Sequence, residues 1–353
     1  MKITVSFILI GILMIGVFSV EVWANPDGAL TERFSVEGRY DIVANGVGLF
    51  GTTSGNIPLN VPGTVVKAFL YWAGFENSSS SDDTVSFSID GGAATSLTAD
   101  HVFGPDFWWG FDTTEYYHFV YVENVTPLIL TGSHTYNVLD VAMEHNYGAG
   151  LMVVYKDPYL PYSIVKILDG LDSAHFEFTP PQGPNTNVTC IQFDDTSDYR
   201  DMNITLFVGG VQNDTRANAI WYQTGTGAKP TNLVGEADAT MLDGPPYPYP
   251  LGAYDGEEWD TYINNIIVQP DDTRACIQIE SVENYTHLGA SVLLISSAFV
   301  LRTSPPVGGI IIPVNLTELL APWIILLSLI AVVSVAVIAR KRHLVTPQRA
   351  RNS

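Results

Sequence analysis

The stretch Asp83-Thr-Val-Ser-Phe-Ser-Ile-Asp90 decides the fold class of this 353-residue chain. Its apolar residues alternate with serines, so Val85, Phe87 and Ile89 point to one face and the serines to the other. A period of two predicts a β-strand with one face on a core and one face in water. The Asp-Gly-Gly that closes the stretch is typical of a tight turn.

Similar runs recur along the chain, rich in β-branched and aromatic residues and bounded by Gly, Pro, Asn or Asp. They cover residues 64–72, 116–122, 136–141, 148–155, 163–168, 188–193, 202–208, 263–268, 275–279 and 290–301. Within them, Leu151–Tyr155 and Val292–Ile295 are continuously apolar, which predicts central strands covered on both faces. No segment before Leu319 has a helical period. The chain is therefore expected to be all-β, with a β-sandwich or jelly-roll-like architecture.

The two ends of the chain predict a membrane protein. Residues 1–24 have a positive start at Lys2, an apolar run and Val-Trp-Ala at the end, as in a secretory signal cleaved after Ala24. An uncleaved N-terminal anchor is the alternative.

Residues 319–339 carry no charged side chain, and at 1.5 Å per residue they span about 31 Å, the thickness of a hydrocarbon core. The basic tail, residues 340–353, begins with Arg-Lys-Arg, which predicts that this side is cytoplasmic. A Pro- and Gly-rich stalk over 304–318 joins the helix to an ectodomain over 25–303, in one sandwich or two packed lobes. We expect a single-pass type I protein of the plasma membrane with an extracellular ectodomain.

The charge and the cysteine count exclude several classes of function. Lys and Arg total 16 against 37 Asp and Glu, a formal net charge of −21, which argues against a nucleic-acid partner. Two cysteines are too few for a disulfide-dense scaffold or a four-cysteine zinc site. Both are followed by Ile-Gln, in candidate strands, so Cys190 and Cys276 either form a disulfide or stay buried as free thiols.

Several separate motifs carry a resemblance. They are Val66-Lys-Ala-Phe-Leu-Tyr-Trp-Ala-Gly74, Asp82-Asp83-Thr-Val, Tyr147-Gly-Ala-Gly-Leu-Met-Val-Val-Tyr-Lys-Asp-Pro158, Leu160-Pro-Tyr and Leu168-Asp-Gly-Leu-Asp172. Together they resemble a family of β-rich prokaryotic cell-surface domains of unknown function, over roughly residues 39–210. The run from Pro306 to Pro322 is similar to the membrane anchors of archaeal surface proteins. The resemblance implies a surface location, and it supplies no catalytic residue.

Asn-x-Ser/Thr sequons support an exterior domain, because all of them lie between the predicted signal and the predicted helix. Those expected to carry glycans are Asn77, Asn124, Asn187, Asn203, Asn213 and Asn284. Asn315 lies too close to the predicted bilayer. Chance occurrence of so short a motif is the alternative.

Catalytic and cofactor motifs are weak. No Gly-x-Ser-x-Gly or His-Glu-x-x-His occurs, no phosphate-binding loop is present, and the six exterior histidines are scattered. We therefore expect no cofactor other than calcium, for which the acidic loop with Asp194, Asp195, Asp198 and Asp201 could supply oxygen ligands. A solvated acidic loop is the alternative, since the spacing is not that of an EF-hand.

The densest aromatic group is Phe107-Trp108-Trp109, with Phe111 close by. Exposed, Trp108 and Trp109 could stack on sugar rings, whereas in the core they would only fill space. The sequence thus predicts a non-enzymatic surface protein for display, adhesion or envelope structure, with surface proteins or glycans as partners. The alternative is a carbohydrate-binding receptor or a glycoside hydrolase, for which two carboxylates would have to face each other across a cleft.

Overall fold

The computed structural model describes residues 27–80, 82–109, 115–180, 182–212, 215–282 and 288–304, and for Trp108 and Trp109 it describes the backbone alone. The described residues all belong to one compact unit, Met1–Ser304. The predicted signal, stalk, transmembrane helix and basic tail lie outside the described residues, apart from Ser304. Within the described ranges, no helix is both long and apolar enough to cross a bilayer.

The predicted all-β fold is confirmed for the described residues, which form eighteen strands and one short 3₁₀ helix, η1 (Thr126–Leu128). The first ten strands are β1 (Thr31–Gly38), β2 (Tyr40–Gly48), β3 (Gly55–Val61), β4 (Thr64–Glu76), β5 (Thr84–Ile89), β6 (Thr95–Thr98), β7 (His101–Trp109), β8 (Glu115–Asn124), β9 (Gly132–Leu139) and β10 (His145–Lys156). The others are β11 (Ser163–Ala174), β12 (Thr189–Gln192), β13 (Arg200–Gly209), β14 (Asn218–Gly225), β15 (Thr240–Asp243), β16 (Trp259–Val268), β17 (Arg274–Ser281) and β18 (Val292–Arg302).

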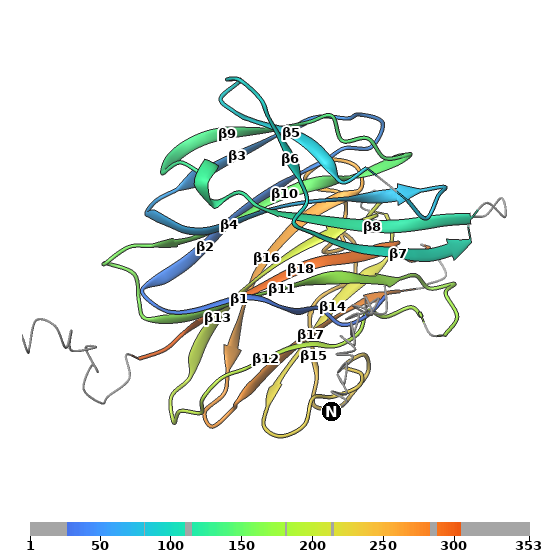
Figure 1. Cartoon of the computed structure of the whole chain (residues 1–353). Helices are drawn as coiled ribbons and strands as arrows, with labels where there is room; N and C mark the ends of the chain where they lie inside the picture. The colour runs from blue at the N-terminus through green and yellow to red at the C-terminus, as the bar shows by residue number, and fades with distance from the viewer. Residues whose placement is uncertain are drawn as a thin grey trace, which may run out of the picture. The chain divides into compact units, whose positions relative to one another are not determined.

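The strands form four antiparallel sheets, stacked as two sandwiches (Figure 1). The first lobe pairs outer sheet 1 (β3-β9-β5-β6) with inner sheet 1 (β2-β10-β4-β8-β7). The second lobe pairs inner sheet 2 (β1-β11-β18-β13-β16) with outer sheet 2 (β12-β17-β14-β15). A third apolar core lies between the two inner sheets.

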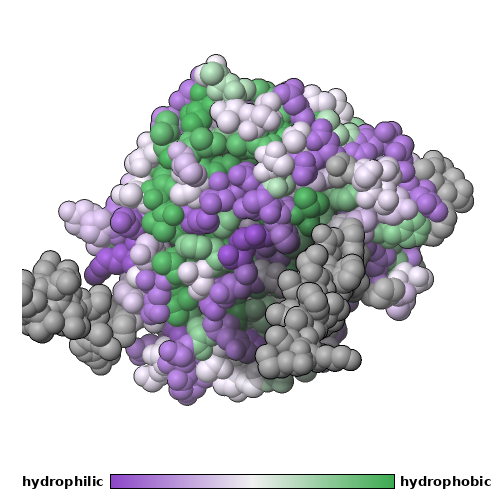
Figure 2. All heavy atoms as spheres, in the orientation of Figure 1, coloured by the Kyte–Doolittle hydropathy of each residue, from purple (hydrophilic) through white to green (hydrophobic). Residues whose placement is uncertain are grey.

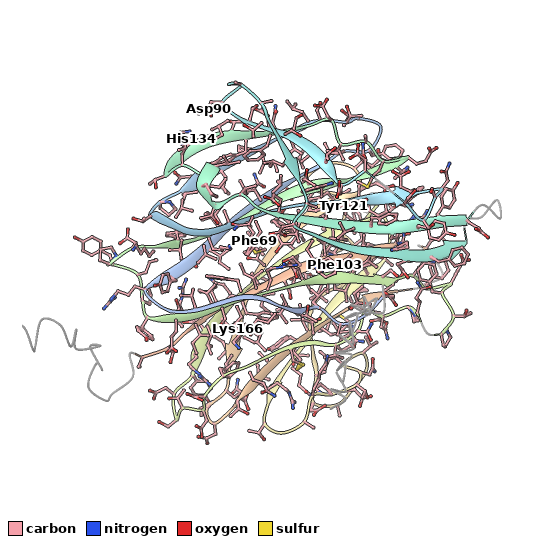
Figure 3. The ribbon with its side chains drawn as sticks, in the orientation of Figure 1. Phe69, Asp90, Phe103, Tyr121, His134 and Lys166 are labelled. Carbon is pink, nitrogen blue, oxygen red and sulfur yellow. A yellow bond between two sulfur atoms is a disulfide. The ribbon has the colours of Figure 1, made fainter. Side chains whose placement is uncertain are left out.

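Inner strands read as continuous apolar runs because both of their faces are covered. In β4, Leu70 and Trp72 enter the core of the first lobe, whereas Phe69 and Tyr71 enter the core between the lobes. Figure 3 shows Phe69 deep between the layers. The expectation that Leu151–Tyr155 and Val292–Ile295 belong to central strands is confirmed by β10 and β18.

The stretch 83–90 forms β5 of outer sheet 1, and its Val85 and Phe87 are buried in the core of the first lobe. One part of the expected alternation is wrong, since Ser88 is buried and does not face water. Its hydroxyl donates a hydrogen bond to Asn137 Oδ1 on the neighbouring strand β9, at 3.2 Å, which meets its polar requirement without solvent.

The first strand of the chain ties the lobes together. β1 pairs with β11 in the second lobe, and β2, only one residue later, pairs with β10 in the first lobe.

At the other end of inner sheet 2, the edge strand β16 leaves Ile263 and Ile267 exposed. Figure 2 shows hydrophobic residues gathered in a band on the left of one face, with hydrophilic residues over much of the described remainder.

Candidate functional site

A cavity of about 620 Å³ opens at one end of the contact between the two inner sheets. In inner sheet 2, antiparallel pairing brings four strand ends to the edge where the cavity opens. The end of β11 pairs with the start of β18, the start of β18 pairs with the end of β13, and the end of β13 pairs with the start of β16. They bring Ala174, Val292, Gly210 and Glu258 to the same edge of the cavity. A volume of this size is typical of small-molecule sites, and a boundary between lobes is a common place for one.

Inner sheet 1 contributes a row of side chains that crosses four adjacent strands. His145 on β10 is the register partner of Phe75 on β4, Phe75 is the partner of His118 on β8, and His118 is the partner of Asp106 on β7. Register partners in a sheet lie on the same face, so the row presents its members together. Phe75, His118 and His145 line the cavity.

His145 pairs with Glu258, the residue that directly precedes β16 of inner sheet 2. The distance between His145 Nε2 and Glu258 Oε1 is 3.3 Å, and only 7% of Glu258 is exposed. The imidazole of His145 stacks on Phe75, with ring centroids 4.5 Å apart and planes at 8°. This stacking and the carboxylate together fix the orientation of His145 at the cavity wall.

Glu258 holds its position through an uncommon backbone conformation. Its φ is +76°, which is strained for a residue with a Cβ and is tolerated where the surrounding structure enforces it. The amide of Gly210 donates to the carbonyl oxygen of Glu258 at 3.0 Å. Two residues later, Asp260 accepts hydrogen bonds from the amides of Gly252 and Ala253, at 2.7 and 2.9 Å, which fixes the preceding loop.

The buried carboxyl of Asp260 has a pKa of about 6, because desolvation outweighs the hydrogen bonds that favour its charged form.

His118 belongs to a second polar chain behind the cavity wall. Its Nε2 lies 2.9 Å from the hydroxyl of Tyr147, and its Nδ1 lies 3.8 Å from Asp106 Oδ2. Burial raises the pKa of the Tyr147 phenol well above its ordinary value, so Tyr147 stays protonated and can donate to His118. In that arrangement His118 presents its Nδ1–H toward Asp106.

Asp106 connects the two lobes. Both of its carboxylate oxygens accept from Gln182 Nε2, at 3.1 and 3.0 Å, and one accepts from the hydroxyl of Ser173 on β11, at 3.0 Å. The same hydroxyl lies 3.2 Å from Asp27. Burial raises the pKa of Asp27, and the charge of Asp106 adds to the rise.

A third histidine, His175, lies at the start of the loop after β11. Its Nδ1 accepts a hydrogen bond from the Glu177 amide at 3.3 Å, so the other ring nitrogen carries the proton of the neutral imidazole. Burial lowers the pKa of His175, which keeps it neutral. Phe178 packs on its ring at 5.4 Å between centroids, and Gln212 adds an amide to the cavity wall.

Of the aromatic residues singled out in the sequence, Phe107, Trp108 and Trp109 lie on β7, beside this cavity. Phe107 lines it and is 37% exposed. The backbones of Trp108 and Trp109 end the same strand, and their side chains and Phe111 lie outside the described residues. Sugar stacking by Trp108 and Trp109 stays a prediction.

The four aspartates predicted to bind calcium do not form a ligand cluster. No group of three or more His, Cys, Asp or Glu side chains in the described ranges is placed to hold a metal ion. In the 194–201 loop, the guanidinium of Arg200 donates to the carbonyl oxygens of Asp194 and Asp272, each at 2.8 Å. Asp195, Asp198 and Asp201 are exposed. An arginine thus supplies the positive charge next to this loop.

The two cysteines are joined. Cys190 on β12 and Cys276 on β17 are register partners and form a disulfide with an S–S distance of 2.09 Å. The bridge fastens the short edge strand β12 to outer sheet 2.

The sequons differ in their surroundings. Asn77 is exposed in the turn after β4. Asn124 accepts from the hydroxyl of Thr126 at 2.6 Å, Asn187 donates to the buried Asp172 at 3.1 Å, and Asn203 on β13 accepts from Asn265 at 3.0 Å. Asn213, Asn284 and Asn315 lie outside the described residues.

The histidines of the cavity are the functional candidates that sequence reasoning missed. His118, His145 and His175 stand far apart in the chain and show no ligand spacing. Only strand register brings two of them into one row and the third to the same opening.

Comparisons with known proteins show no family. No protein-family model matches the chain, and no curated protein matches it. Solved structures similar to it include PNGase F, a glycosylasparaginase from Flavobacterium meningosepticum, with 15% identity, a TM-score of 0.25, and coverage of 78% of this chain and 98% of that one. Another is the ANXUR1 extracellular domain from Arabidopsis thaliana, with 8% identity, a TM-score of 0.23, and coverage of 78% and 93%. Such low TM-scores give no basis for a shared function.

Proposed function

We propose that this chain is a non-enzymatic cell-surface binding protein whose cavity between the inner sheets holds a carbohydrate. The observation that carries the proposal is the composition of the cavity wall, which combines Phe75, Phe107 and Phe178 with amide, imidazole and carboxylate groups. Sugars present apolar C–H faces that pack on aromatic rings, and hydroxyls that need both donors and acceptors.

The surface location is part of the proposal. It rests on the predicted signal at 1–24, the predicted single helix at 319–339 and the basic tail that follows. In this arrangement the sandwich unit is displayed outside the plasma membrane on the 304–318 stalk. Adhesion through surface glycans is then the cellular role that fits both the location and the cavity.

A glycan-array screen of the purified full-length chain tests the proposal. We expect a specific set of glycans to bind the wild type and to bind Phe107→Ala at least about tenfold more weakly. Tyr159→Ala is the matched control, because Tyr159 is 93% exposed and does not line the cavity. It should bind as the wild type does.

Two outcomes would overturn the proposal. Absence of any specific glycan would remove carbohydrate recognition and leave envelope structure or contact with surface proteins as the hypothesis to test. Release of new reducing ends from a bound glycan would replace the binding role with glycoside hydrolysis.

A further inference from the structure

The electrostatics of the cavity narrow the class of sugar. Its described lining includes two carboxylates, Glu177 and Glu258, and no Lys or Arg side chain. Its other titratable groups are the three histidines and Tyr147, of which His175 is neutral and Tyr147 stays protonated. Arg216 acts on His175 electrostatically but does not line the cavity. The wall is therefore acidic.

Glu258 is the carboxylate best placed to choose a ligand. It is almost fully buried, it lines the cavity, and its backbone is held in a left-handed conformation with φ of +76°. Its Oε1 lies 3.3 Å from Nε2 of His145, and the described lining of the cavity holds no Lys or Arg that could pair with it. Burying a carboxylate is costly unless cations or hydrogen-bond donors join it, so a cationic ligand gains an ionic contact with Glu258 that a neutral ligand cannot make.

The aromatic side chains favour the same kind of ligand. Phe107 on β7 and Phe178 in the loop after β11 both line the cavity. Aromatic faces attract ammonium groups, and the attraction grows as water is excluded. A cavity wall that combines a carboxylate with aromatic rings thus suits an alkylammonium group.

We infer that the cavity selects amino sugars, with the free ammonium group next to Glu258. The inference rests on the proposed carbohydrate-binding function and names its ligand class. The sugar ring would contact the aromatic side chains, while Gln182 and Gln212 supply hydrogen bonds to hydroxyls. Neutral sugars and N-acetylated sugars lack the charge that Glu258 requires.

The test compares sugars that differ only at carbon 2. Binding to the purified full-length chain is measured by calorimetry at pH 7 for glucose, galactose and mannose, for their 2-amino forms and for their N-acetylated forms. At least one amino sugar should bind about tenfold more tightly than both of its counterparts. Because the contact is ionic, raising the salt concentration should reduce that preference. This comparison needs no variant, so it does not depend on how a mutant folds.

Glu258→Gln keeps the shape of the side chain and removes its charge. It should abolish the preference for the amino form while changing the Kd of the neutral sugar less than about threefold. Glu257→Gln is the matched control, because Glu257 is the exposed neighbour and does not line the cavity. It should keep the wild-type preference.

The outcomes separate the two proposals. If no sugar of any form binds, carbohydrate binding itself is wrong. If amino and neutral sugars bind equally to the wild type, only the amino-sugar inference is wrong. It is also wrong if Glu258→Gln weakens both forms by the same factor, since Glu258 would then act by positioning His145.

Discussion

At the scale of single residues, Asp90 and His134 show how a turn sets the charge state of a surface histidine. Asp90 follows β5 with φ of +52°, and its carboxylate lies 2.8 Å from His134 Nδ1 and accepts from the Thr135 amide at 2.8 Å. Figure 3 shows the two side chains together at the edge of the first lobe. The hydrogen bond with Asp90 raises the pKa of His134, and the same contact lowers the pKa of Asp90.

The signs of these shifts define a pH window. The contribution of His134 to stability is lost as pH rises through its raised pKa, and that of Asp90 is lost as pH falls through its lowered pKa.

We predict that Asp90→Asn returns the pKa of His134 to about 6.5, as measured by NMR titration. Asp140→Asn is the control, since Asp140 is also exposed with a positive φ but lies at the other end of β9. An unchanged His134 pKa in Asp90→Asn would contradict the assignment.

At the scale of elements, an irregularity in β7 places Asp106. The register between β7 and β8 shifts between Phe103 and Asp106, and Gly104 within the shift has φ of +113°. A Cβ at Gly104 would lie 2.4 Å from the carbonyl oxygen of His118, so both the conformation and the space require glycine.

We predict that Gly104→Ala costs at least about 2 kcal/mol of unfolding free energy, measured by urea denaturation. Gly91→Ala is the matched control, because Gly91 has φ of +71° and a Cβ there would meet nothing within 4 Å. It should cost about 1 kcal/mol. Equal costs for the two variants would show that the close approach to His118 has no energetic weight.

The disulfide acts on the same scale, since it closes a loop with a sequence separation of 86. In the chain-entropy model a loop of this length contributes about 4–5 kcal/mol by restricting the unfolded chain. The double variant Cys190→Ala and Cys276→Ala should therefore lower the urea midpoint strongly. Wild-type protein in reductant should approach the same midpoint once Cys276, which is fully buried, has been reduced. Alkylation of either thiol in the unreduced protein would contradict the bridge.

At the scale of the whole sandwich unit, Trp259 holds the two lobes in contact. It belongs to inner sheet 2, is fully buried, and packs directly against the backbone of glycines in inner sheet 1. A Cβ at Gly46, Gly148 or Gly150 would come within 2.1 to 2.8 Å of its ring. The absence of side chains at these positions therefore sets how closely the lobes approach, next to the cavity that Glu258 enters.

We predict that Trp259→Ala costs about 3–5 kcal/mol of unfolding free energy and weakens sugar binding by opening the contact between the lobes. Trp221→Ala is the control, because Trp221 is partly buried in the small cluster around the disulfide, on outer sheet 2. It should cost less and leave binding intact. A loss of stability no larger than that of Trp221→Ala would contradict the role given to Trp259.

The sequence by itself determined the all-β class and the positions of many of the strands. Period-two alternation and continuous β-branched runs located most strands of the inner sheets, because those patterns arise from burial of one face or both. Among the strands that it did not locate are β1, where Glu32, Arg33 and Glu37 interrupt the apolar pattern, and the glycine-containing β2. These strands are selected by pairing with β11 and β10 and not by their own composition.

Only the tertiary structure decided where the candidate site lies. The row His145, Phe75, His118 and Asp106 exists because four strands far apart in sequence pair in one register, and Glu258, directly before β16 of another sheet, meets that row. Local patterns carry the period of a strand, whereas register depends on turns, bulges and packing between sheets. For that reason the alternation at 83–90 predicted an all-β protein, whereas the position of the cavity depends on how the two lobes pack and could not be predicted from the sequence.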